Sequence, residues 1–99
     1  MLNIKPTIEN EKAVFVLEGR LDSMTSSDLE KELTPVLPDL KELTLDLEKL
    51  DYISSAGLRV FLLAQKTMNE KGKMTVVHVN ETIMEIFEVT GFSDILTIE

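Results

Sequence analysis

The sequence predicts an α/β fold: a mixed, mostly parallel β-sheet with an antiparallel N-terminal edge hairpin and packed α-helices. Strand-like apolar segments alternate with segments of helical spacing, as they do when crossover helices join parallel strands. The first two strand patterns are separated only by a short polar turn, which indicates a hairpin. The 99 residues suffice for one compact core, so we expect residues 1–99 to form a single domain.

The hairpin is predicted from residues 2–8 and 13–17. In the first segment Leu2, Ile4 and Ile8 alternate with polar residues, and Pro6 falls on their face. Proline cannot donate a ladder hydrogen bond, so we expect an edge strand. Residues 9–12 form a polar turn, and the continuous apolar run at 13–17 is typical of a strand covered on both faces.

A helix is predicted after the second strand. Hydroxyl side chains at positions 25–27 are candidate N-caps, and Ser27 with Glu30 fits a capping box. Apolar residues recur at helical spacing to about Leu37, and Pro38 is expected to mark the helix end.

The central segment predicts a third strand over residues 43–47, where leucine alternates with polar residues. Residues 48–51 are expected to form a polar loop. A buried helix carrying Leu58 to Met68 follows, and Gly72 is its expected C-terminal cap.

The last third predicts an apolar strand over residues 74–79, then a helix capped by Asn80 and ended by Gly91. Residues 96–98 add a short final strand or a tail. The predicted order is therefore β-β-α-β-α-β-α with a short ending.

Composition excludes several classes of function. The net charge of −8 argues against binding to nucleic-acid phosphates or to an anionic membrane surface, and favours a basic or mixed-charge protein partner. There is no cysteine and only one histidine, which excludes disulfides and Cys- or His-rich metal sites. No apolar run approaches the length of a membrane span. We expect no cofactor and, by elimination, a cytoplasmic location.

Two segments stand where strands end and helices begin, the usual position of sites in open α/β sheets. They are 19–25 and 52–58. In the second, Ser54 and Ser55 stand at a predicted helix N-terminus, where free N–H groups and the helix dipole favour negative charge. A phosphate on Ser55 would be stabilised there, but either serine could instead serve only as a helix cap. Both roles are compatible on adjacent serines.

The stretch Leu45-Asp46-Leu47 followed by residues 52–58, Tyr-Ile-Ser-Ser-Ala-Gly-Leu, resembles the signature of bacterial anti-sigma-factor antagonists, the STAS family. Gly19-Arg20-Leu21-Asp22, followed by Thr25, is similar to a second marker of the family. The element order also fits, and the resemblance covers essentially the whole chain. It implies a STAS-type fold.

The resemblance places Ser55 at the family's phosphoserine position. It implies that an anti-sigma serine kinase phosphorylates Ser55, that a metal-dependent serine phosphatase reverses the reaction, and that the unphosphorylated form binds the kinase and frees a sigma factor. Ser54 departs from the pattern, because the family usually has Asp there. Arg59 replaces a common small residue, and its guanidinium could pair with a phosphate or simply face solvent.

The expected partner-binding surface includes both segments. Asp22 could orient a hydroxyl or contact the partner, or it could be only a turn residue, and the two interpretations weigh about evenly. Thr25 is better explained as a cap, and Gly57 would leave room for close backbone approach. The full expected set is Asp22, Thr25, Ser54, Ser55, Ala56, Gly57 and Arg59.

Other polar residues are assigned no function. His78 has no partner nearby in sequence and is not expected to bind metal. Asp46, Glu48 and Asp51 are interpreted as a solvated rim where a strand runs into a loop.

The sequence therefore predicts a monomeric binding module regulated by phosphorylation, with no catalytic residues. Two alternatives remain. A non-switching scaffold subunit of a signalling or transporter-associated assembly would self-associate independently of phosphorylation. An enzyme or nucleotide-binding protein would bind nucleotides, although no phosphate-cradling glycine-rich loop is present.

Overall fold

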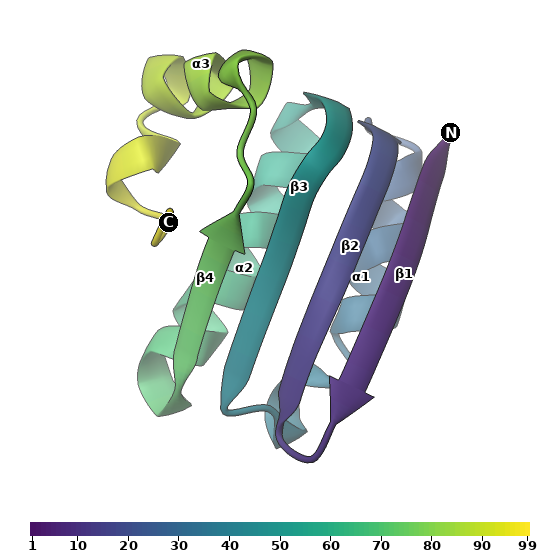
Figure 1. The fold of residues 1–99 in the computed structure, drawn as a ribbon, viewed down its shortest axis with the longest axis vertical. Coiled ribbons are helices and arrows are strands. Elements are labelled where there is room, and N and C mark those ends of the chain that lie inside the picture. Colours follow the sequence, from purple (N-terminus) through teal and green to yellow (C-terminus); the bar gives the residue numbers. More distant parts are fainter.

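A computed structural model describes residues 1–99 and confirms the predicted fold class (Figure 1). Its sheet has the order β1-β2-β3-β4, and only the β1–β2 pair is antiparallel. The strands are β1 (Leu2–Glu9), β2 (Lys12–Leu21), β3 (Glu42–Ile53) and β4 (Lys73–Val77). The helices are α1 (Thr25–Leu33), α2 (Ser55–Lys71) and α3 (Glu81–Thr90), with 3₁₀ turns η1 (Leu37–Asp39) and η2 (Phe92–Asp94).

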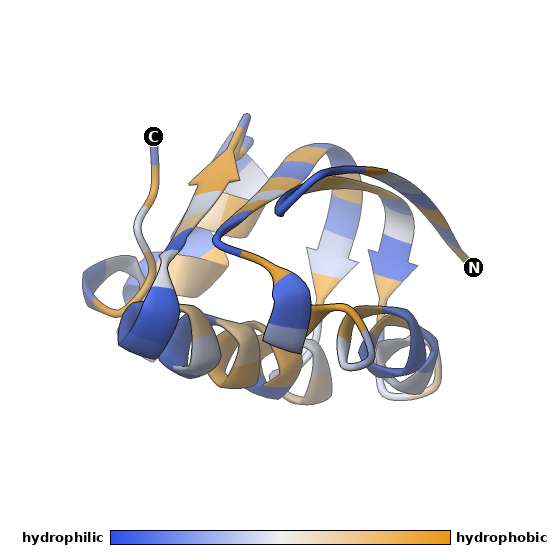
Figure 2. Cartoon of the chain, turned by 90° about the horizontal axis from the view of Figure 1, so that it is seen from below, coloured by the Kyte–Doolittle hydropathy of each residue, from blue (hydrophilic) through white to orange (hydrophobic).

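Helices α1 and α2 cover one face of the sheet and leave the other face open (Figure 2). The apolar core lies between these two layers. Along β2, Phe15 and Leu17 are almost fully buried, whereas Val14 is 39% exposed on the opposite face. The expectation that residues 13–17 would be covered on both faces is therefore wrong, because no helix packs on the second side.

The N-terminal hairpin is confirmed, with β1 at the edge of the sheet. Pro6 lies within β1 opposite Phe15, where its missing N–H costs no ladder bond to a further strand. Asn10 and Glu11 connect the strands, and Asn10 adopts a φ of 58°, which asparagine tolerates better than most residues.

Helix α1 ends at Leu33, earlier than predicted. Pro35 follows and has no N–H to continue the helical hydrogen bonds, which explains the early end. Pro38 does not terminate a helix. It lies in the first turn of η1, where a missing N–H is harmless.

Strand β3 is longer than predicted, because the expected loop at 48–51 is part of it. The register against β2 shifts twice, between Val16 and Glu18 and between Gly19 and Arg20. These irregularities interrupt the alternation of core-facing and outward-facing side chains along β3. As a result Leu47, Leu50 and Ile53 all face the core although they are three residues apart.

Strand β4 ends at Val77, two residues before its predicted end, because His78 leaves the extended conformation with a φ of 55°. The ends of α2 and α3 follow the predicted signals. The Asn80 side chain accepts a hydrogen bond from the N–H of Ile83 at 2.9 Å, and Gly91 ends α3 in the left-handed region at a φ of 82°. Gly72 caps α2 as predicted. Of the short final strand or tail expected at residues 96–98, the structure shows a single parallel bridge between Val76 and Ile98. None of the helices combines the length and apolar character needed to cross a membrane.

Candidate functional site

The two predicted junctions lie side by side at the carboxyl end of the sheet. Leu21 at the end of β2 is in register with Ile53 at the end of β3. The N–H of Ser54 donates to the carbonyl of Leu21 at 2.8 Å, which links the start of α2 to the turn that leads into α1. The parallel pairing therefore brings together segments that are about thirty residues apart in sequence.

Ser54 is the N-cap of α2. Its backbone is extended, with φ −92° and ψ 173°, and its carbonyl accepts the first helical hydrogen bond, from Leu58 at 2.9 Å. Its hydroxyl accepts from the N–H of Gly57 at 3.3 Å. Serine and aspartate are comparable N-caps, so Ser54 can fill the structural role of an aspartate at this position without the charge.

Ser55 is the first residue of α2, and its side chain is exposed. Its hydroxyl makes no hydrogen bond to the protein, in contrast to that of Ser54. The first turn of α2 holds no acidic residue, so no carboxylate there offsets the positive end of the helix dipole. The two serines thus divide the roles, with Ser54 as cap and Ser55 as a free hydroxyl in a field that favours an anion.

Gly57 is buried against the ends of the two strands. An added Cβ would lie 2.8 Å from Cγ of Leu21 and 2.9 Å from Cγ1 of Ile53. The close backbone approach expected at Gly57 is therefore that of α2 to the ends of β2 and β3. The small size of this glycine allows α2 to pack closely on the sheet.

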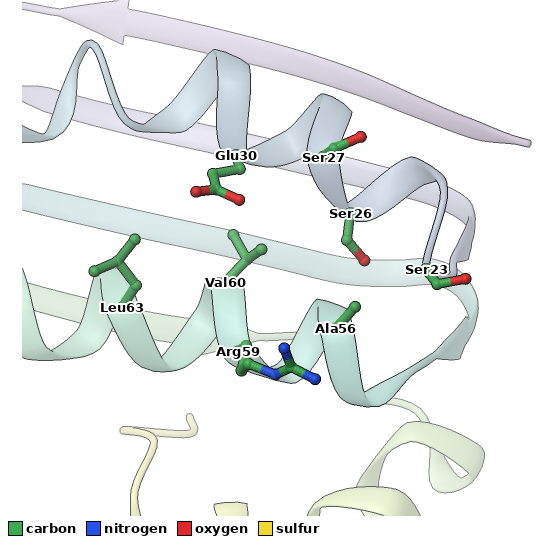
Figure 3. A pocket seen from close by; sticks show the side chains of 8 residues that line it. All are labelled: Ser23, Ser26, Ser27, Glu30, Ala56, Arg59, Val60 and Leu63. Carbon is green, nitrogen blue, oxygen red and sulfur yellow. The ribbon is translucent and has the colours of Figure 1, made fainter.

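Arg59 is exposed one helical turn after Ser55 and forms no ion pair. Its side chain extends along α2 toward Ala56 (Figure 3). Residues at i and i+4 lie on the same face of a helix, so Arg59 lies within reach of a group attached to Ser55.

Arg59 also lines a cavity of about 360 Å³ between α1 and α2, which we call the α1–α2 groove. Arg59 is its one basic lining residue, and Glu30 across the groove is its one acidic residue. The lining residues are Ser23, Ser26, Ser27, Glu30, Ala56, Arg59, Val60 and Leu63.

Asp22 caps α1. Its Oδ1 accepts hydrogen bonds from the N–H groups of Thr25 at 2.9 Å and Met24 at 3.0 Å. Thr25 Oγ1 in turn accepts from the N–H of Asp22 at 2.9 Å, which completes a reciprocal capping box. The hydrogen bond from the Thr25 N–H, above all, lowers the pKa of Asp22.

This capping box replaces the predicted one. Ser27 donates to the carbonyl of Met24 and does not pair with Glu30, so the predicted Ser27–Glu30 box is wrong. Asp22 makes no hydrogen bond to Ser55, and its one engaged oxygen serves the helix start. Thr25 takes part in the cap as the sequence favoured, but as the first residue of α1, where its hydroxyl accepts from the N–H of Asp22. The structure thus favours the structural role of Asp22 over direct orientation of Ser55.

Several groove residues were missed from the sequence, namely Ser23, Ser26, Ser27, Glu30, Val60 and Leu63. The groove residues of each helix recur every three or four residues, as residues on one helix face do, and on α2 they continue the series that begins with Ala56 and Arg59. This spacing became informative only once α1 and α2 were known to lie side by side (Figure 3).

Comparison with known proteins agrees with this geometry. The family model described as "Mlab, STAS domain" matches residues 4–97. An anti-sigma-B factor antagonist of Staphylococcus aureus is 32% identical over 97 residues, which cover 96% of this chain and 90% of that protein.

Solved structures share the fold. A crystal structure of an anti-sigma factor antagonist from Mycobacterium paratuberculosis aligns with a TM-score of 0.88 at 18% identity, covering 99% of this chain and 85% of that one. The phosphorylated form of Bacillus SpoIIAA aligns with a TM-score of 0.76 at 15% identity, covering 100% and 91%. With its motifs, its family-model match and its 32% identical relative, the chain belongs to the STAS domain family of anti-sigma factor antagonists.

Proposed function

We propose that this chain is a phosphorylation-regulated anti-sigma factor antagonist that acts as a single domain and as a monomer in a bacterial partner-switching pathway. In its unphosphorylated form it binds an anti-sigma serine kinase. Phosphorylation of Ser55 by that kinase releases it, and a metal-dependent serine phosphatase restores binding. Because the kinase uses ATP, the site of action is the cytoplasm. The chain itself carries out no catalysis.

The observation that carries this proposal is the free, exposed hydroxyl of Ser55 at the start of α2. A kinase must reach the hydroxyl oxygen, and no protein group competes for it. The phosphorylated form of SpoIIAA, a protein of the same fold, gives independent support for a phosphate on this kind of domain.

The docking surface comprises the start of α2 and the α1–α2 groove. In the first turn of α2, Ser55 is exposed and Ala56 is half-exposed, and Arg59 supplies the positive charge of the surface. Ser54, Gly57, Asp22 and Thr25 contribute by holding the two helix starts in place. The kinase surface facing Arg59 is expected to carry a carboxylate.

Phosphorylation acts through charge. It adds about −1.5 to −2 charge and three acceptor oxygens at the centre of this surface. The phosphate can pair with Arg59 on the same helix face, which removes the groove's one cation from the partner. A difference of about 3 kcal/mol between the two forms would weaken binding more than a hundredfold without any change of fold.

The test combines mass spectrometry with binding measurements. After incubation with the cognate kinase and ATP, the parent chain and a Ser27→Ala control should each gain one phosphate at Ser55, and Ser55→Ala should gain none. Ser55→Asp should weaken kinase binding and Ser55→Ala should retain it. Phosphate on Ser27 or any other residue, or equal kinase binding by Ser55→Asp and the parent chain, would contradict the proposal.

A further inference from the structure

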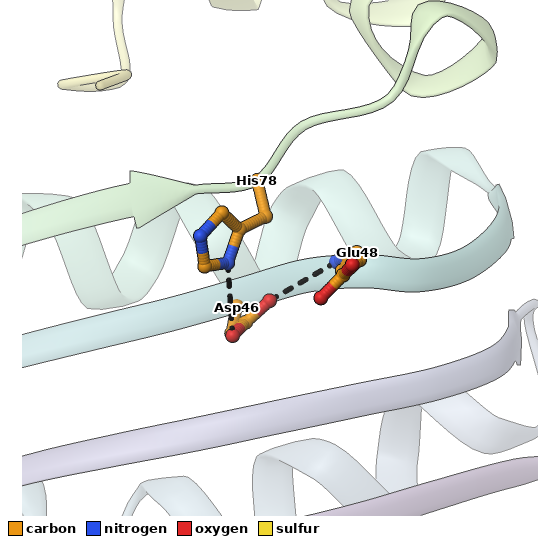
Figure 4. A network of polar contacts seen from close by, with 3 residues as sticks. All are labelled: Asp46, Glu48 and His78. Carbon is orange, nitrogen blue, oxygen red and sulfur yellow. Dashed lines mark hydrogen bonds and ion pairs between the residues drawn. The ribbon is translucent and has the colours of Figure 1, made fainter.

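The open face of the sheet carries a cluster of three side chains, two carboxylates and an imidazole, that lies apart from the Ser55 site. Asp46 and Glu48 project from the same side of β3, and His78 follows β4 (Figure 4). One ligand atom from each of the three residues lies within 4.8 Å of the others. We propose that Asp46, Glu48 and His78 form a binding site for a divalent transition-metal ion, with zinc as the best match.

His78 reaches this face because of its backbone. In β4, Met74 and Val76 face the core, so simple alternation would direct residue 78 inward. His78 instead adopts a left-handed φ of 55°, and its ring lies over β3 toward Asp46 (Figure 4). The partners that the sequence did not show for His78 are therefore supplied by the neighbouring strand.

The distances suit a shared ion. The Nδ1 atom of His78 lies 3.1 Å from Oδ2 of Asp46. Two ligand atoms held at about 2.0–2.2 Å from one ion, at an angle of roughly 90–110°, are themselves roughly 3.0–3.5 Å apart. An ion can thus bind between these two atoms with little movement, and the exposed Glu48 side chain can turn to supply a third ligand.

The surroundings of Asp46 favour this geometry. Its other oxygen, Oδ1, accepts a hydrogen bond from the backbone N–H of Glu48 at 3.1 Å, which orients the carboxylate so that Oδ2 faces Nδ1 of His78, where the ion would bind. The Asp46 side chain is 20% exposed and that of His78 is 61% exposed, so water has access to the remaining coordination positions.

The ligand types decide which ion is preferred. Calcium and magnesium select oxygen ligands, whereas an imidazole with two carboxylates suits zinc and neighbouring transition metals. The net charge of −8 further favours a cation over an anion at this face.

The experiment is a zinc titration of the full chain by calorimetry, with nuclear magnetic resonance of the ring protons of His78. Because the chain has one histidine, these signals need no separate assignment. We expect one zinc ion per chain, shifted ring signals, and no response to calcium. His78→Asn tolerates the left-handed backbone and should bind zinc at least tenfold more weakly, as should Asp46→Asn.

Asp51→Asn, which removes an exposed carboxylate of β3 outside the cluster, and Ser55→Ala are the matched controls and should bind zinc like the parent chain. Melting temperatures of the variants establish that each is folded. The proposal is overturned if the parent chain shows no saturable zinc binding, or if His78→Asn binds zinc as tightly as Asp51→Asn does.

Discussion

The division of roles between Ser54 and Ser55 predicts unequal effects of alanine on stability at two adjacent positions. Ser54→Ala removes the helix cap, a change that costs about 0.5–2 kcal/mol of stability in general. The hydrogen bond from the N–H of Gly57 to the Ser54 hydroxyl is 3.3 Å long, slightly beyond the usual range, so we expect the lower part of that interval, about 0.5–1 kcal/mol. Ser55→Ala removes an unbonded, exposed hydroxyl and should change stability by less than about 0.5 kcal/mol.

A third variant tests the direction of the electrostatic effect. Ser54→Asp places a carboxylate at the positive end of the helix dipole, where it should stabilise the protein by about 0.3–1 kcal/mol at low salt. The same change restores the family's usual residue. Raising the salt concentration should reduce this gain, because the position is partly exposed to solvent.

Thermal and urea denaturation of the three variants beside the parent chain measure these effects. In a domain of this size 1 kcal/mol corresponds to roughly 4–8 °C in melting temperature, so Ser54→Ala should melt roughly 2–8 °C lower. If Ser55→Ala destabilises the protein more than Ser54→Ala does, the two roles have been assigned to the wrong serines. The urea m value should be unchanged in all three variants.

Three further predictions concern packing, acid stability and the cap of α3. Gly57→Ala should lower the melting temperature, because the clash with the buried side chain of Leu21 costs about 1–3 kcal/mol and outweighs the roughly 1 kcal/mol helix-propensity gain; an unchanged or higher melting temperature would contradict the packing role. The pKa of Asp22 is lowered in the folded state, so the stability that its carboxylate contributes is fully present above its ordinary pKa of 3.8 and is lost as the pH falls through the lowered pKa. Asp22→Asn should therefore flatten the pH dependence of the urea midpoint below pH 3.8, and an unaltered profile would refute this. Asn80→Ala should cost about 2 kcal/mol, since it removes both the cap and a 2.8 Å hydrogen bond to the carbonyl of Leu50, whereas Asn80→Ser should keep the cap and lose only the second bond; equal urea midpoints for the two variants would show that the cap contributes nothing.

Features set by local sequence were predictable. The cap at Asn80 and the left-handed end at Gly91 depend on residues within one helical turn, and both are confirmed. The placement of Ser54 and Ser55 at a helix start was also predictable from the sequence, because this polar pair directly precedes a long apolar helical pattern. The sequence did not show which of the two serines is the cap and which keeps a free hydroxyl, since either serine satisfies the same local rule.

Features set by the sheet were not predictable from a local pattern. The spacing of Leu47, Leu50 and Ile53 does not match the two-residue alternation of a strand, and the shifted register against β2 explains it. The burial of Gly57 depends on β2 lying beside β3, and the contact between His78 and Asp46 depends on β4 lying on the other side. Each of these contacts joins residues that are neighbours only after the strands pair.

The absence of a helix layer on one side of the sheet has an evolutionary consequence. Substitutions at outward positions of the strands, such as Val14, alter a surface that no core residue depends on, whereas changes beneath α2 disturb packing and the Ser55 site together. The open side of the domain can therefore accept substitutions without loss of the core, so we expect relatives of this chain to differ most in surface chemistry on that side.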